Sequence, residues 1–191
     1  EAWKIHYRPI PLGSALIIVP SWLENPDPDR QAVLMDPGMA FGSGTHPSTQ
    51  LCLILIEEYL NENPVQEMLD IGTGSGILAI AAAKLGVSSV IGVDIDQKAV
   101  EIAKKNSELN QTKNQTRFAV GSVASFLAGD IQPEKAELVV ANMIAPYLEK
   151  LVGQRLVELL KPGGSIVLSG ILETQVSSLI HQLLDRDLKI E

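Results

Sequence analysis

The chain has 191 residues, of which 46% are hydrophobic and 20% charged, a composition typical of one globular domain with a well-buried core. Its formal net charge of −8 at pH 7 disfavours direct binding to nucleic-acid phosphates. The single cysteine, Cys52, excludes an internal disulfide, and the three histidines are too far apart for a metal-ligand motif. We therefore expect a cytoplasmic protein with no membrane span, no bound metal and no direct nucleic-acid contact.

The first 35 residues are predicted to be rich in β-structure. Two apolar runs, 15–19 and 32–35, have the length and composition of strands, and the segment 25–29 between them has the Asn, Pro and Asp residues typical of turns. We expect residues 1–35 to form a linker or N-terminal extension, and residues 36–191 to form a separate domain.

A long loop without lysine, arginine or glutamate follows, over residues 36–49. It is rich in glycine yet contains Met39 and Phe41, which favours a functional lid over a disordered segment. Ser48 or Thr49 is predicted to cap a helix over residues 50–60. His46 is a candidate general base only because it lies in this loop, and a histidine that stabilises the loop is the favoured interpretation.

The segment 68–85 contains the most informative motif of the chain. A short apolar run ends at Asp70 and Ile71, glycines follow at positions 72, 74 and 76, and an alanine-rich helix begins directly afterwards. This order of strand, tight turn and helix is the first half of a βαβ unit. The next predicted strand, 89–93, ends at Asp94, about 20 residues after the turn, where such folds present a carboxylate to a ribose diol.

The remaining elements continue the alternation of strands and helices. We expect a helix capped by Asp96, and then strands at 116–120, 136–141 and 165–169, helices at 146–160 and 173–187, and the first residues of a sixth strand at 188–190. This pattern predicts an α/β fold with a mostly parallel, doubly wound, Rossmann-like sheet. Four polar or glycine positions fall at the carboxyl ends of its strands, where ligands bind; they are Gly72, Asp94, Ser122 and Asn142.

The glycine pattern alone does not identify a cofactor. Residues 74–79 also satisfy the G-x-G-x-x-A pattern of nicotinamide enzymes, with Asp94 at the expected distance. An oxidoreductase is therefore one alternative, and a non-catalytic Rossmann-like binding module is another. Asp94 has a plain structural interpretation as the residue leading into a helix, and Asn142 has one as a turn residue.

Several segments together resemble a known family. The string 70–76, Asp94 and the Leu-Lys-Pro-Gly-Gly segment 160–164 are similar to class I S-adenosylmethionine methyltransferases, and segments 36–49, 140–145 and 168–172 resemble the PrmA family of bacterial ribosomal protein methyltransferases. The resemblance implies methylation of lysine side-chain and α-amino nitrogens of a large-subunit ribosomal protein. It also implies a substrate-recognition domain before this sequence and further strands after it, so we expect the C-terminal edge of the sheet to be truncated.

The resemblance places cofactor-binding positions at Thr49, Gly72, Asp94 and Asn142. Physical roles can be assigned around them: Asp70 would attract the cofactor's ammonium, and the N–H groups of Gly72, Thr73 and Gly74 would approach its methionine end. Asp94 would accept both ribose hydroxyls, Ser122 would meet the adenine, and Asn142 would accept a hydrogen bond from the amine that receives the methyl group. Asn142 is thus the predicted catalytic residue of an in-line displacement that requires no metal.

Overall fold

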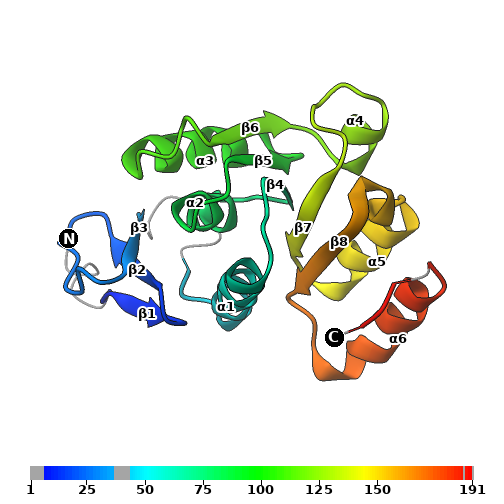
Figure 1. Cartoon of the computed structure of the whole chain (residues 1–191), viewed down its shortest axis with the longest axis horizontal. Helices are drawn as coiled ribbons and strands as arrows, with labels where there is room; N and C mark the ends of the chain where they lie inside the picture. The colour runs from blue at the N-terminus through cyan, green and yellow to red at the C-terminus, as the bar shows by residue number, and fades with distance from the viewer. Residues whose placement is uncertain (1–6, 37–43, 187, 191) are drawn as a thin grey trace.

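The computed structural model describes residues 7–36, 44–186 and 188–190. Its elements form two sheets, one of three strands at one end of the molecule and one of five strands with helices around it (Figure 1). In chain order they are β1 (Ile10–Leu12), β2 (Leu16–Pro20), β3 (Gln31–Met35), α1 (Pro47–Glu62), β4 (Glu67–Ile71), α2 (Ile77–Lys84), β5 (Ser89–Asp94), α3 (Gln97–Leu109), β6 (Thr116–Val120), α4 (Val123–Leu127), β7 (Ala136–Asn142), α5 (Ala145–Gly153), a short 3-10 helix (Leu156–Leu159), β8 (Leu160–Ser169) and α6 (Glu173–Leu184).

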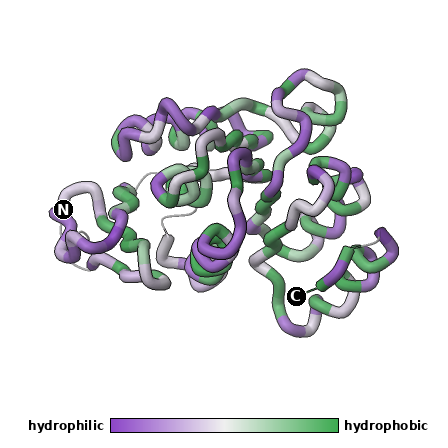
Figure 2. Tube along the Cα trace, in the orientation of Figure 1, coloured by the Kyte–Doolittle hydropathy of each residue, from purple (hydrophilic) through white to green (hydrophobic). Residues whose placement is uncertain are grey.

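The larger sheet is parallel throughout and has the strand order β6-β5-β4-β7-β8. Side chains of β4 alternate between its two faces: Met68 joins a cluster with α1, α2 and α3, whereas Leu69 joins a second cluster with α4, α5 and α6. Figure 2 shows both hydrophobic and hydrophilic residues along α1, as expected for a helix that covers one face of the sheet. The predicted doubly wound parallel fold is confirmed.

The strand order reverses between β4 and β7, since β5 and β6 lie on one side of β4 and β7 and β8 on the other. Such a reversal separates the loops that leave two adjacent strands and opens a crevice beyond their carboxyl ends. The fold therefore places the ends of β4 and β7, at Ile71 and Asn142, at the position where this architecture binds ligands.

The small sheet confirms the predicted β-rich start of the chain. β2 pairs antiparallel with β1 and parallel with β3. β1 was not predicted, because it has only three residues. Leu16, Ile18 and Val33 share one hydrophobic cluster with α1 and α2. We propose to keep the boundary between the N-terminal extension and the larger domain at residues 35 and 36. This boundary separates the two sheets, although the hydrophobic core continues across it.

A buried carboxylate on α1 fastens the small sheet to the larger domain. Glu57 is 3% exposed, and its Oε1 accepts hydrogen bonds from the N–H of Ser14 at 2.6 Å, the hydroxyl of Ser14 at 2.7 Å and the N–H of Ala15 at 3.0 Å. These donors lie in the turn between β1 and β2. A Cβ at Gly13 would lie 2.6 Å from Glu57 Oε2, so glycine is needed for this close approach.

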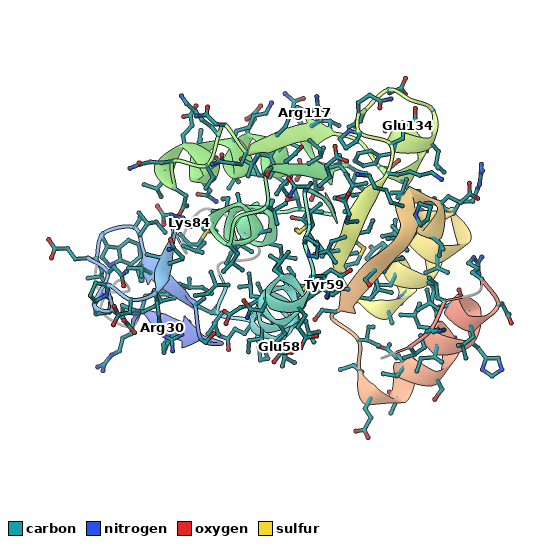
Figure 3. All side chains as sticks on the ribbon, viewed as in Figure 1. Arg30, Glu58, Tyr59, Lys84, Arg117 and Glu134 are labelled. Carbon is teal, nitrogen blue, oxygen red and sulfur yellow. The ribbon has the colours of Figure 1, made fainter. Side chains whose placement is uncertain are left out.

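We predict that Glu57→Ala lowers the free energy of unfolding by about 2 kcal/mol, because three donors lose a charged acceptor. Urea unfolding followed by circular dichroism measures the change. Glu58 is the matched control, since it directly follows Glu57 on α1 (Figure 3) but is exposed. Glu58→Ala should stay within about 0.5 kcal/mol of the parent; equal effects of the two changes would contradict a specific role for Glu57.

Several local predictions were wrong or incomplete. The helix expected over 146–160 ends at Gly153, and β8 begins at Leu160 rather than at 165, with an irregular register to β7. Residues 188–190 form no strand, and the five-residue helix α4 was not predicted. The predicted lid residues Met39 and Phe41 lie outside the described residues.

Candidate functional site

The glycine turn after β4 is fixed by β5. The N–H groups of Gly72 and Thr73 both donate to the carbonyl of Val93, at 2.8 and 2.9 Å, and the N–H of Gly74 donates to Asp94 Oδ2 at 3.0 Å. These amides were expected to face a ligand, but each has an acceptor within the chain. They instead hold the turn against the end of β5, and so set the position of Asp94.

Gly72 takes a backbone conformation that other residues rarely adopt. Its φ is +75°, which is unfavourable for residues with a Cβ. An added Cβ would also lie 2.3 Å from Cε of Met143, the terminal methyl of a side chain that would have to move. Met143 directly follows Asn142, the residue predicted to be catalytic, at the end of β7.

Asp94 is half-buried at the end of β5, and both of its carboxylate oxygens face polar groups. Oδ2 accepts from Gly74, and Oδ1 accepts from the N–H of Asp96 at 3.0 Å. A carboxylate oxygen can accept more than one hydrogen bond, so each keeps capacity for a further donor. Asp94 can therefore receive a pair of hydroxyl groups while it orders the turn.

Asp70 is fully buried beneath this turn. The hydroxyl of Thr73 donates to its Oδ2 at 2.6 Å, whereas Oδ1 has no hydrogen-bond partner within the described part of the chain. Burial raises the pKa of Asp70 from its ordinary 3.8 to about 7, although the hydrogen bond from Thr73 opposes this rise. A buried carboxyl oxygen without a donor fits a cationic ligand group or a bound water.

We predict that Asp70→Asn flattens part of the pH dependence of stability. Because the folded pKa of Asp70 is higher than the unfolded one, the folded state binds more protons between pH 4 and 7, and the contribution of Asp70 to stability falls as pH rises through that range. In urea unfolding, the variant should therefore gain stability relative to the parent between pH 5 and pH 8. A constant difference between the two proteins over that range would contradict the raised pKa.

Thr49 and Asn142 are in contact although they lie 93 positions apart in the sequence. Asn142 lies at the end of β7, and its Nδ2 donates to the Thr49 hydroxyl oxygen at 3.0 Å. Thr49 lies in the first turn of α1 and is 3% exposed. With the amide nitrogen held by Thr49, the other end of the carboxamide, Oδ1, is an acceptor at the rim of the sheet.

The predicted caps of α1 were wrong, since His46 is the N-cap. Its Nδ1 accepts from the N–H of Ser48 at 3.2 Å and contacts the Ser48 hydroxyl at 2.7 Å. This supports the favoured interpretation of His46 as a residue that stabilises the loop. Thr49 does not cap the helix, and its side chain contacts Asn142 instead.

Ser122 lies at the end of β6 and is the N-cap of α4, and its N–H donates to the Ser125 hydroxyl at 3.2 Å. The preceding residue, Gly121, donates to the carbonyl of Asp94 at 3.0 Å, which places Ser122 beside the end of β5. The structure thus brings all eight predicted cofactor positions to the carboxyl ends of β4 to β7 and the adjoining turn of α1; they are Thr49, Asp70, Gly72, Thr73, Gly74, Asp94, Ser122 and Asn142.

Sequence reasoning missed one polar residue here, Ser169. It is 8% exposed at the end of β8, pairs in register with Asn142, and donates its hydroxyl to the carbonyl of Ser48 at 2.8 Å. Its position at a strand end was visible in the sequence, but its contact with a residue 121 positions away was not.

A hollow of about 1070 Å³ lies elsewhere on the described surface. It is bordered by α1, β8 and α6, with Leu55, Val167 and Leu179 among its lining. None of the predicted cofactor positions lines it. Among the described residues, no cluster of His, Cys, Asp and Glu could hold a metal ion, and no helix could span a membrane.

Comparisons with known proteins identify the family of the chain. The model of the family "Ribosomal protein L11 methyltransferase (PrmA)" matches residues 1–191. Two curated relatives named ribosomal protein L11 methyltransferase, from Chloroflexus aurantiacus and Shewanella woodyi, are each 42% identical over 94% and 97% of this chain. The chain spans only 60% and 61% of the lengths of these two relatives.

Solved structures give the same result. A structure titled as a ribosomal protein L11 methylase from Lactobacillus delbrueckii subsp. bulgaricus has a TM-score of 0.80 and 36% identity, over 97% of this chain and 93% of that one. A precorrin-6y C5,15-methyltransferase from Geobacter metallireducens shares the fold, with a TM-score of 0.60 and 19% identity over 74% of each chain. The chain therefore belongs to the ribosomal protein L11 methyltransferase (PrmA) family.

Proposed function

We propose that this chain is the catalytic part of an S-adenosylmethionine-dependent protein N-methyltransferase. In the whole protein it would transfer methyl groups to lysine side-chain and α-amino nitrogens of ribosomal protein L11, in the cytoplasm. The proposal rests on one arrangement: a carboxylate at the end of β5 and a carboxamide at the end of β7, in Asp94 and Asn142, lie at one rim in a chain of the PrmA family.

The residues at the rim fit the cofactor by their chemistry. Asp94 would accept hydrogen bonds from the two ribose hydroxyls, and the half-buried Ser122 would lie against the adenine. Asp70 would attract the ammonium group, directly or through water, because its Oδ1 lacks a donor. A cationic group beside Asp70 would in turn favour its charged form. The backbone at Gly72, Thr73 and Gly74 would allow close approach of the methionine end.

Asn142 would orient the amine that receives the methyl group. Its Oδ1 would accept a hydrogen bond from the amine and direct the nitrogen lone pair along the line of displacement. When bound, S-adenosylmethionine supplies an electrophilic methyl group, so that an N–C bond forms while the C–S bond breaks and S-adenosylhomocysteine leaves.

A lysine must lose its proton before it can react. With an ordinary pKa of about 10.4, keeping it neutral at pH 7 costs roughly 4.6 kcal/mol. Removing the amine from water lowers this cost, since desolvation disfavours the charged form. Asn142 cannot remove the proton itself, because a carboxamide is not a base; its role is to hold the neutral amine.

The two alternatives have no support in the comparisons, since the similar proteins named above are methyltransferases. The net charge of −8 also fits a basic protein partner better than nucleic acid. Calorimetric titration of this chain compares the candidate cofactors directly. We expect binding of S-adenosylhomocysteine and none of NAD; binding of NAD alone would overturn the proposal.

The activity itself is tested on the full-length protein, since this chain spans only 60% and 61% of the lengths of its two curated relatives. Incubation with purified ribosomal proteins and methyl-labelled S-adenosylmethionine should transfer label to L11. Label in another ribosomal protein but not in L11 would contradict the proposed substrate, and an absence of label together with an absence of cofactor binding would contradict the proposed reaction.

A further inference from the structure

The ends of β7 and β8 are joined at Ser169 by more than the regular pairing of the sheet. Asn142 and Ser169 are register partners, and the N–H of Met143 donates to the carbonyl of Ser169 at 3.0 Å. The next residue, Gly170, has a φ of +89°, and a Cβ there would lie 2.6 Å from the carbonyl oxygen of Met143. The backbone of Ser169 is therefore closely fitted to the residues beside Asn142.

The side chain of Ser169 extends from this junction to a third element. Its hydroxyl donates to the carbonyl of Ser48 at 2.8 Å, in the first turn of α1. The following residue, Thr49, receives the carboxamide of Asn142. Ser169 and Asn142 thus hold consecutive residues of the same helical turn, and a displacement of this turn would move the oxygen that fixes the Asn142 carboxamide.

The first turn of α1 has its own cap, which sets its shape but not its place on the sheet. His46 caps the turn locally, and Gln50 Nε2 donates to the carbonyl of Gly44 at 3.1 Å. These contacts join residues within six positions of one another. The hydrogen bond from Ser169 to the Ser48 carbonyl, by contrast, joins this turn to β8, 121 positions away, and helps to fix the turn relative to the strand ends.

We propose that Ser169 is a positioning residue for methyl transfer. It holds the first turn of α1 over the ends of β7 and β8, so that Thr49 keeps the amide nitrogen of Asn142 and presents Oδ1 to the amine. This inference rests on the proposed function, in which Asn142 orients the substrate. Ser169 does not itself touch substrate or cofactor, and it acts through Ser48, Thr49 and Asn142.

The test uses the full-length protein with three changes on β8. Ser169→Ala removes the hydroxyl, Ser169→Thr keeps one, and Ser165→Ala is the matched control at a position four residues from the site. We expect Ser169→Ala to lower kcat for L11 methylation about tenfold, because small misplacements of reacting groups are costly. The affinity for S-adenosylhomocysteine should stay within about threefold, and Ser169→Thr and Ser165→Ala should retain activity.

A second readout requires no cofactor. The side-chain NH2 of Asn142 gives a pair of amide signals in a nitrogen–proton NMR spectrum, which Asn142→Asp identifies by their loss. Ser169→Ala and Thr49→Val should both shift this pair, whereas Ser165→Ala should not. Unchanged Asn142 signals in Ser169→Ala would overturn the proposal, whether or not kcat falls. Unchanged kcat with shifted signals would also overturn it, as the contact would then have no role in transfer.

Failure of this inference is distinguishable from failure of the proposed function. If the parent protein binds S-adenosylhomocysteine and methylates L11 while Ser169→Ala does so equally well, only the role of Ser169 is wrong. If the parent does neither, the proposed function is wrong and the positioning role falls with it.

Discussion

Replacing Asn142 with alanine should lower kcat for methyl transfer by about 100-fold or more and leave cofactor affinity within about threefold. The carboxamide would act on the amine, through Oδ1, while Nδ2 is held by Thr49. Removing one preorganised polar contact at a reacting centre typically costs 10²- to 10³-fold in rate. Initial rates with labelled S-adenosylmethionine give kcat, and calorimetry with S-adenosylhomocysteine gives the affinity.

Asn114→Ala provides the control for this change, since Asn114 is exposed in the turn before β6. It should leave both quantities unchanged. An Asn142→Ala protein with kcat within threefold of the parent would contradict a catalytic role. A protein whose cofactor affinity falls as steeply as its rate would place Asn142 in cofactor binding alone.

Replacing Asp94 with alanine should weaken cofactor binding about 100-fold or more. A ribose diol would lose two hydrogen bonds to a charged acceptor, each worth roughly 1.5–3 kcal/mol. The same carboxylate also accepts from the N–H groups of Gly74 and Asp96, so the variant loosens the glycine turn as well. Asp94→Asn keeps one acceptor oxygen and should bind with intermediate affinity.

A change at Asp96 separates the loss of cofactor contacts from the loss of local stability. It caps α3 by accepting from the N–H of Lys98 at 2.8 Å, and it lies two residues beyond Asp94. Asp96→Ala should cost about 1 kcal/mol of stability, as the loss of a helix cap typically does. Its affinity for S-adenosylhomocysteine should match that of the parent. Equal losses of affinity in Asp94→Ala and Asp96→Ala would show that the effect is one of local stability.

The parallel sheet was predictable because each of its strands is a short apolar run that ends at a polar or glycine residue. The run that ends at Ile71 and the run that ends at Asp94 are buried on both faces, as strands of a parallel sheet are. The glycine turn and the alanine-rich helix between these two runs predicted the βαβ order. Asp94 was placed correctly at the rim for the same reason. These features depend on neighbours in the sequence.

Two element boundaries, the end of α5 and the start of β8, were predicted wrongly for physical reasons. The helix after Asn142 ends at Gly153, and Arg155 then takes a φ of +71°, which breaks the helical run although residues up to Leu160 continue its apolar pattern. Gly153 was the available signal, since glycine often ends a helix. The segment 160–164 was separated from its strand because its proline and glycines are typical of turns, whereas it forms the irregular start of β8.

The contacts of the site could not be predicted from the sequence. Thr49 and Asn142 were each identified, but only the packing of α1 against the ends of β7 and β8 brings their side chains to 3.0 Å. Ser169 was missed for that reason. The amides of the glycine turn were expected to be free for a ligand, and the structure instead pairs them with Val93 and Asp94, because β5 ends directly beside the turn.

A crystal structure of this chain with bound S-adenosylhomocysteine would show whether the nucleoside lies at the ends of β4, β5 and β7. We expect the ribose hydroxyls to lie within hydrogen-bond distance of both Asp94 oxygens and the sulfur to lie on the side of Asn142 Oδ1. Nucleoside density away from the ends of β4, β5 and β7, or a sulfur atom directed away from Asn142, would contradict this expectation.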